Sequence, residues 1–219
     1  MDNLSNIGVI KSLFEKHGFS FSKALGQNFL VNPSVCPRIA ENGYAQSGFG
    51  VIEIGTGVGV LTNELAKRAD KVVAIEIDDR LMPILNETLQ EYDNVKIINA
   101  DVMDTDLNKL ISEEFNGMNV AVCANLPYYI TSPILSALLE AKCFEAVTVM
   151  VQKEVGNRFK AISGTKDYSS LSIFLKYYFE VNKILDVSRN VFIPKPNVDS
   201  IVVEFVKKKD KVNVNNEEL

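Results

Sequence analysis

Four consecutive residues, Asn125-Leu126-Pro127-Tyr128, have the types and spacing needed to hold a planar amine. They follow an apolar run, residues 118–123, that is typical of a buried strand. An Asn side-chain oxygen and a backbone carbonyl can both accept N–H groups, which draws the nitrogen toward tetrahedral geometry and frees its lone pair. An aromatic ring can stack on a base lifted out of its helix. The tetrapeptide therefore predicts a clamp for the exocyclic amine of a nucleobase. The alternative is a strand that ends in a turn, with Asn and Pro as turn formers and the Tyr in the core.

Further candidate residues lie at the ends of three earlier predicted strands. The sequence GTGVG (residues 55–59) joins the first strand to its helix, and glycine lets a backbone turn sharply and approach a ligand closely. Glu76 ends the second strand about 20 residues later, where an acid can accept both hydroxyls of a ribose. Asp101 ends the third strand and can receive the amino group of an adenine. A tight turn, a strand-end carboxylate and a helix cap would explain each feature singly, but together with Asn125 they indicate a nucleotide site.

The glycine spacing bears on which nucleotide this site takes. GxGxG differs from the GxGxxG pattern that usually cradles a pyrophosphate. A ligand with an adenosine and no phosphate fits better, and S-adenosylmethionine is such a ligand. A nicotinamide-linked oxidoreductase is the less favoured alternative.

Histidine and cysteine usage excludes several kinds of chemistry. His17 is the only histidine, near the end of the first predicted helix, so the chain has no imidazole for a Ser-His-Asp triad. Cys36, Cys123 and Cys143 are an odd number without paired spacing, and we expect core thiols rather than metal ligands or disulfides. We therefore expect no metal, and a reaction that runs without a histidine base.

The bulk composition is that of a cytoplasmic globular protein. Apolar residues make up 47% of the 219, no apolar stretch is long enough to cross a bilayer, and the first 18 residues lack the layout of a signal peptide. We expect a monomer that does not bind membranes. The net charge of −5 does not indicate a nucleic-acid binder, although a local basic face is enough to engage phosphates.

The elements that must position these residues alternate strictly between strand and helix from residue 51 onward. The first 18 residues predict an amphipathic helix with Leu4, Ile7, Ile10 and Phe14 on one face, and Pro33 fits the first turn of a second helix that runs to about residue 45. We then expect strands at 51–55, 71–78, 95–101, 118–125, 146–152, 181–187 and 200–206. Continuous apolar strands with helices between them predict an α/β fold with a Rossmann-like, mostly parallel seven-stranded sheet. The last two strands, joined by FIPKPNVD, are predicted to pair antiparallel.

Seven stretches of sequence, in order, give the chain a family resemblance: KALGQNFLVNP, VIEIGTGVGVLT, VVAIEID, NAD, ANLPYYITSPIL, VMVQKEVGNRF and FIPKPNVDSIVV. With them the chain resembles the ribosomal RNA adenine N6,N6-dimethyltransferases, in particular the small-subunit (16S) type linked to kasugamycin sensitivity. The resemblance implies the class I S-adenosylmethionine-dependent methyltransferase fold. It also implies a methyltransferase domain at 1–207 (a helical extension 1–48 and a core 49–207), a polar tail at 208–219, and the absence of the family's C-terminal helical domain.

The resemblance assigns residues to two parts of a site. The cofactor, S-adenosyl-L-methionine, which leaves as S-adenosyl-L-homocysteine, would contact Gln27, Asn28, Leu30, Gly55, Gly57, Gly59, Glu76, Ile77, Asp101, Val102 and Asn125. The target adenine would be held by Asn125, by the carbonyl of Leu126 or Pro127, and by Tyr128 on one face of the base. Phe192 is similar to the family's second stacking aromatic; the alternative is a core residue before a strand.

The implied activity is dimethylation of N6 on two adjacent adenosines of 16S rRNA, within the small ribosomal subunit or its precursor. The alternatives are a large-subunit rRNA adenine methyltransferase of the macrolide-resistance type, a DNA adenine methyltransferase, and a ribosome-assembly factor that binds without turnover. The large-subunit enzymes tend to carry NIPY and to lack the PKPNVDS form, so the small-subunit substrate is favoured.

Overall fold

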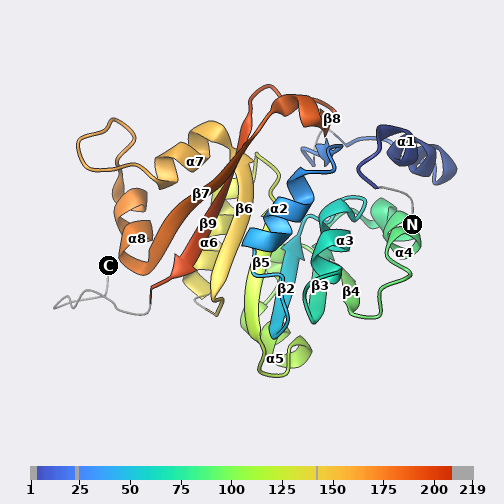
Figure 1. Cartoon of the computed structure of the whole chain (residues 1–219), viewed down its shortest axis with the longest axis horizontal. Helices are drawn as coiled ribbons and strands as arrows, with labels where there is room; N and C mark the ends of the chain where they lie inside the picture. Colours follow the sequence, from blue (N-terminus) through green and yellow to red (C-terminus); the bar gives the residue numbers. More distant parts are fainter. Residues whose placement is uncertain (1–3, 23–24, 142, 209–219) are drawn as a thin grey trace.

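A seven-stranded sheet runs through the computed structural model, which describes residues 4–22, 25–141 and 143–208 (Figure 1). The strand order is β4-β3-β2-β5-β6-β9-β7. Every strand runs in one direction except β9, which is antiparallel to both of its neighbours. The strands are β2 (Phe49–Ile54), β3 (Lys71–Glu76), β4 (Val95–Asn99), β5 (Asn119–Asn125), β6 (Ala146–Gln152), β7 (Phe179–Val187) and β9 (Ser200–Lys207). The predicted fold class is confirmed.

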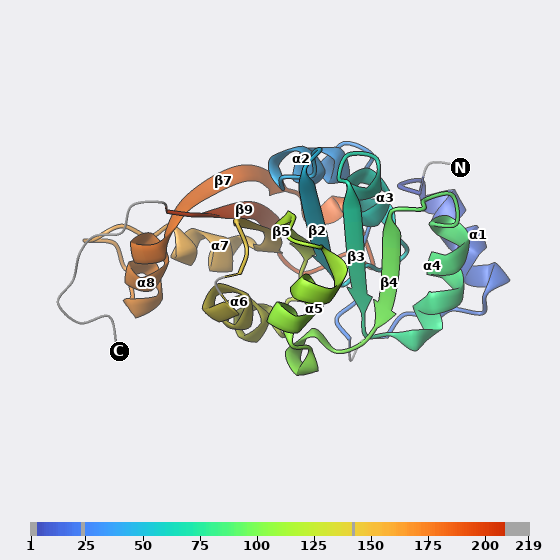
Figure 2. The same ribbon diagram turned by 90° about the horizontal axis from the view of Figure 1, so that it is seen from below.

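The central strands are apolar on both faces because helices cover both faces of the sheet (Figure 2). One core contains buried residues of α1 (Ile7–Lys16), α2 (Val35–Asn42), α3 (Val60–Ala66) and α4 (Met82–Thr88). The core on the opposite face contains buried residues of α5 (Leu107–Glu114), α6 (Thr131–Ala141), α7 (Lys153–Phe159) and α8 (Ser170–Tyr178). Short 3₁₀ turns, η1 (Asp79–Leu81), η2 (Val102–Asp104) and η3 (Arg189–Val191), complete the chain.

The N-terminal helices differ in detail from the sequence prediction. Ile7 is 47% exposed, and the buried stripe of α1 is Ile10, Leu13 and Phe14. Pro33 precedes α2 rather than starting it, because the side-chain oxygen of Asn32 accepts hydrogen bonds from the backbone N–H (2.9 Å) and hydroxyl (2.6 Å) of Ser34. This local turn uses the residues that would have formed the first helical turn.

A two-stranded ribbon that the sequence did not predict ties the two ends of the fold together. β1 (Phe29–Leu30) pairs antiparallel with β8 (Phe192–Ile193), and the N–H of Val31 donates to the carbonyl of Val191 at 2.8 Å. The ribbon fixes the segment before α2 beside the sheet. Except for residue 208, the predicted polar tail lies outside the described residues. Among the helices that are described, none has the length and apolarity to span a bilayer.

Candidate active site

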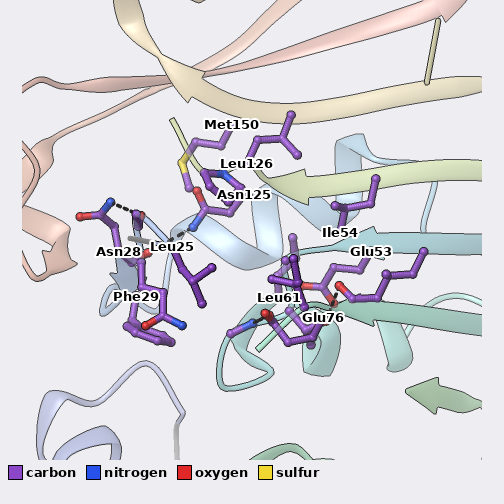
Figure 3. A pocket seen from close by; sticks show the side chains of 18 of the residues that line it. Leu25, Asn28, Phe29, Glu53, Ile54, Leu61, Glu76, Asn125, Leu126 and Met150 are labelled. Atoms are coloured by element: carbon purple, nitrogen blue, oxygen red, sulfur yellow. Dashed lines mark hydrogen bonds between the residues drawn. The ribbon is translucent and has the colours of Figure 1, made fainter. Parts of the chain in front are cut away.

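A cavity opens at the carboxyl ends of β2, β3 and β5, where the candidate residues of the sequence converge (Figure 3). Its walls are the turn at residues 55–58, the strand ends at 75–77 and 100–102, and the tetrapeptide 125–128. Residues 25–30, here called the covering segment, line a further side. Ligands of open α/β sheets bind at the carboxyl ends of the strands.

The glycine turn shapes one wall of the cavity and orients an acid. Gly57 has a φ of 61°, in the region that disfavours other residues, and a Cβ there would lie 3.3 Å from the ring of Phe29. Its N–H donates to Oε2 of Glu76 at 2.9 Å. Gly55 and Gly59 flank it, and Gly59 precedes α3 with a φ of 86°. The turn thus leaves room for a ligand and holds the carboxylate beside it.

Glu76 is buried at the end of β3, and both of its oxygens are oriented by backbone N–H groups. Oε1 accepts from Asp78 at 3.0 Å, and Oε2 accepts from Gly57. Burial raises the pKa of Glu76 against the lowering effect of these hydrogen bonds. Each oxygen retains a second lone pair for a hydroxyl donor. Ile77 follows directly and is exposed at the rim of the cavity.

Asp101 caps the turn that follows β4. Its Oδ1 accepts from the N–H of Met103 at 2.8 Å, whereas its Oδ2 has no hydrogen bond within the described part of the chain. Val102 is buried beside it and contributes an apolar wall. A carboxylate oxygen next to an apolar surface suits the amino edge and the face of an adenine.

Asn125 presents one acceptor to the cavity, because its other end is occupied. Its Nδ2 donates to the backbone carbonyl of Asn28 at 3.3 Å, and its Oδ1 accepts no hydrogen bond from the part of the chain that the structure describes. The carbonyl of Pro127 accepts from the N–H of Ile130 (3.2 Å) and the hydroxyl of Thr131 (3.0 Å). The carbonyl of Leu126 accepts no hydrogen bond from any described residue. Of the two candidate carbonyls, the structure therefore leaves Leu126 available.

Two consecutive tyrosines, the last residue of the clamp and the residue after it, lie beside the cavity. The hydroxyl of Tyr128 lies 2.6 Å from Oγ of Ser200, and burial raises its pKa, so the ring is neutral at pH 7. Tyr129, which the sequence analysis did not single out, also lines the cavity and is 58% exposed. A Cβ at Gly26 would lie 3.0 Å from its ring, so the covering segment packs directly against it.

Phe192 lies outside the cavity. Its side chain is 3% exposed and belongs to the same core as Phe29 and Leu30, where the β1–β8 ribbon pairs it with Leu30. The structure thus brings the expected site residues to the cavity except this one and Gly59, where a Cβ would instead meet Thr88 and Leu89. The alternative of a core residue before a strand fits its surroundings, and the stacking role remains a prediction from resemblance.

Glu53 is a site residue that the sequence analysis missed. It is 1% exposed one residue before the carboxyl end of β2, lines the cavity (Figure 3), and its Oε2 has no hydrogen-bond partner among the described residues. Burial, with a further contribution from Glu76, raises its pKa to about 8 against the lowering effect of Thr62. The signal was present in the sequence as one charged residue inside an otherwise continuous apolar strand.

Comparisons with known proteins agree with this geometry. Residues 18–219 match the family model "Ribosomal RNA adenine dimethylase". A relative from Bacillus mycoides named ribosomal RNA small subunit methyltransferase A is 52% identical over 210 residues, which cover 95% of this chain and 72% of the relative. A dimethyladenosine transferase from Plasmodium falciparum is similar in structure (TM-score 0.73, 33% identity, 83% of this chain and 64% of that one). The 23S rRNA methyltransferase ErmE is equally similar (TM-score 0.75, 31% identity, 85% of this chain and 72% of that one).

The fold and the site define a Rossmann-like S-adenosylmethionine-dependent methyltransferase. Within that class, the chain belongs to the ribosomal RNA adenine dimethylase family.

Proposed function

We propose that this protein transfers methyl groups from S-adenosylmethionine to N6 of adenosines in small-subunit rRNA, twice at each of two adjacent adenosines. The observation that carries the proposal is that Asn125 and Leu126 both line the cavity, and that Oδ1 of the one and the carbonyl of the other accept no hydrogen bond from the described residues. Two acceptors at this place match the two N–H bonds of an exocyclic amine.

The residues around the cavity fit the proposed cofactor. Glu76 offers oriented oxygens to ribose hydroxyls, and Oδ2 of Asp101 with Val102 suits the adenine. The Oε2 of Glu53, buried without a hydrogen-bond partner among the described residues, is the kind of polar atom that a polar group of a ligand would satisfy. We infer that Asn28 and Leu30 contact the methionine portion from the covering segment. Among the described residues, no group of three His, Cys, Asp or Glu side chains is placed to hold a metal ion.

In the proposed reaction the protein aligns the amine with the methyl group and accepts hydrogen bonds from the amine. When bound, S-adenosylmethionine supplies a methyl group already activated by its sulfonium. Asn125 and the carbonyl of Leu126 accept the two amine hydrogens, which localises the nitrogen lone pair and orients it. Tyr128 packs on the base. The only histidine, His17, contacts Glu87 on α4 at 2.7 Å, so the imidazole is committed elsewhere. The amine proton leaves after the nitrogen becomes positively charged, and a strong base is not needed.

The small-subunit substrate is supported by the 52% identity to a relative named for that subunit. An rRNA substrate implies cytoplasmic activity during ribosome biogenesis. The structural similarity to ErmE favours large-subunit rRNA as the second candidate.

The test is methyl transfer from radiolabelled cofactor to small subunits that lack the modification, followed by mapping of the modified adenosines. Large subunits, naked 23S rRNA and duplex DNA compete in parallel reactions. We expect label on two neighbouring adenosines of 16S rRNA and little competition from the others. Preferential labelling of 23S rRNA or DNA would overturn the substrate assignment, and no transfer to any of them would overturn the proposed activity.

A further inference from the structure

Asp78 lies two residues beyond Glu76 and is buried despite its charge. Its side chain is 2% exposed and carries four hydrogen bonds. Three come from Arg80, whose Nε (2.8 Å), Nη2 (2.6 Å) and backbone N–H (3.2 Å) donate to it. The fourth comes from Nε2 of Gln27 at 2.6 Å. Burial alone would raise the pKa of Asp78, but the hydrogen bonds from Arg80 and Gln27 lower it, so the residue is a fixed carboxylate.

Gln27 is held at both ends of its amide. Its Oε1 accepts from the N–H of Ser22 at 2.9 Å, while its Nε2 faces Asp78. Only the amide can make both bonds, because one partner is a donor and the other an acceptor. Gln27 lines the cavity, yet both polar atoms of its side chain are hydrogen-bonded to other protein groups. We therefore expect it to contribute to cofactor binding by positioning the covering segment.

Arg80 fastens the same region from outside. Its Nη1 lies 3.4 Å from the carbonyl of Ser20, and its guanidinium lies 5.2 Å from the ring centre of Phe19. Asp78 thus connects the end of β3 to the chain just before the covering segment and to the covering segment itself.

The opposite side of the covering segment contacts the amine clamp. The carbonyl of Asn28 accepts from Nδ2 of Asn125, and Gly26 lies against the ring of Tyr129. Residues 26–28 therefore cross the cavity from the ribose side to the clamp. The side-chain orientation of Asn125 depends on where the carbonyl of Asn28 lies, and this depends on the anchor at Asp78.

We propose that Asp78 is a positioning residue for methyl transfer: through Gln27 and Arg80 it fixes the covering segment across the cavity and so sets the orientation of Asn125. This inference rests on the proposed function.

The test changes the Gln27 side of the Gln27–Asp78 pair and leaves the Asp78–Arg80 pair intact. Gln27→Glu places two carboxylates 2.6 Å apart, whereas Gln27→Ala removes the hydrogen bond to Asp78 and adds no charge. Asp79→Asn is the matched control, since Asp79 is exposed in the same turn. The readouts are the Kd for S-adenosylhomocysteine, the single-turnover methylation rate on small subunits, and Tm.

We expect Gln27→Glu to raise the Kd about tenfold or more, since a hydrogen bond to a charged group is lost and a repulsion is added, and to lower the single-turnover rate at saturating cofactor. Asp79→Asn should match wild type in both Kd and rate. Gln27→Ala, which adds no charge, should shift Kd and rate in the same direction by less. A Gln27→Glu protein that binds and turns over like wild type, or a folded Gln27→Ala protein with the Kd and rate of Asp79→Asn, would overturn the proposal. If wild type binds the product but methylates no RNA, the proposed function fails while the Kd comparison still decides whether the anchor orders the site.

Discussion

The clearest consequence at the scale of single residues concerns Asn125. Its Nδ2 is tied to Asn28, and its Oδ1 is the acceptor proposed for the target amine. We expect Asn125→Ala to lower the single-turnover methylation rate at least about 100-fold, the loss typical of removing one oriented polar group from an active site. Cofactor binding should be weakened but measurable by calorimetry.

Asn108→Ala, an exposed position on α5, is the matched control and should behave as wild type. Unchanged methylation in Asn125→Ala would show that the clamp is elsewhere.

Glu53 gives a prediction about pH. Its pKa is about 8 in the folded protein against an ordinary 4.5, so between these values the unfolded chain has lost a proton that the folded protein keeps. The contribution of Glu53 to the free energy of unfolding is therefore complete below pH 4.5 and is lost as the pH rises to 8. Glu53→Gln removes this dependence. We expect the free energy of unfolding of the variant to rise relative to that of wild type as the pH increases, by on the order of a few kcal/mol at pH 8.

Urea unfolding of both proteins at several values from pH 5 to pH 8.5 measures this difference. Parallel pH dependences for the two proteins would mean that Glu53 is already ionised in the fold.

At the scale of elements, the β1–β8 ribbon predicts what Phe192 does. Because Phe192 packs in the core beside Leu30, a large aliphatic residue should substitute for it. We expect Phe192→Leu to retain a methylation rate within about threefold of wild type, with a loss of stability below about 1.5 kcal/mol. Phe192→Ala should cost about 3–5 kcal/mol.

Single-turnover assays and urea unfolding measure the two effects separately. A stable Phe192→Leu protein with a rate reduced about 100-fold would instead support the stacking role.

The elements also differ in whether the sequence alone could predict them. The strands from residue 51 onward were predictable because each is a continuous apolar run, and the candidate residues follow directly from where those runs end. The ribbon was not predictable, since each of its strands has two residues and the partners are more than 160 positions apart. The Gln27–Asp78 anchor is a similar long-range pair of side chains, and no local pattern reports it. The exposure of Ile7 was not predictable for the same reason. Periodicity identifies the apolar face of a helix, but it does not show which residues of that face contact another element.

At the scale of the whole molecule, the cavity is built from residues 25 to 150, so a ligand in it should stabilise the entire fold. We expect S-adenosylhomocysteine at 100 times its Kd to add about 2.7 kcal/mol to the free energy of unfolding. For a chain of this length that corresponds to a rise in Tm of roughly 5–10 °C.

Thermal unfolding with increasing S-adenosylhomocysteine measures this shift, with NAD⁺ as the comparison ligand. A rise with NAD⁺ and none with S-adenosylhomocysteine would favour the nicotinamide-linked alternative over the proposed cofactor.

The interior position of β9 has a consequence for how this protein is made. Among the described residues β9 is the last strand in sequence, yet it lies between β6 and β7 and is hydrogen-bonded to both. During synthesis, chains fold from the N-terminus as they emerge, and β6 and β7 must wait with unpaired edges until residues 200–207 arrive. Unpaired strand edges attract other chains. The nascent protein therefore passes through a stage in which its nucleotide-binding half is folded while the edges of β6 and β7 are still unpaired. At that stage a strand of another chain can pair with them.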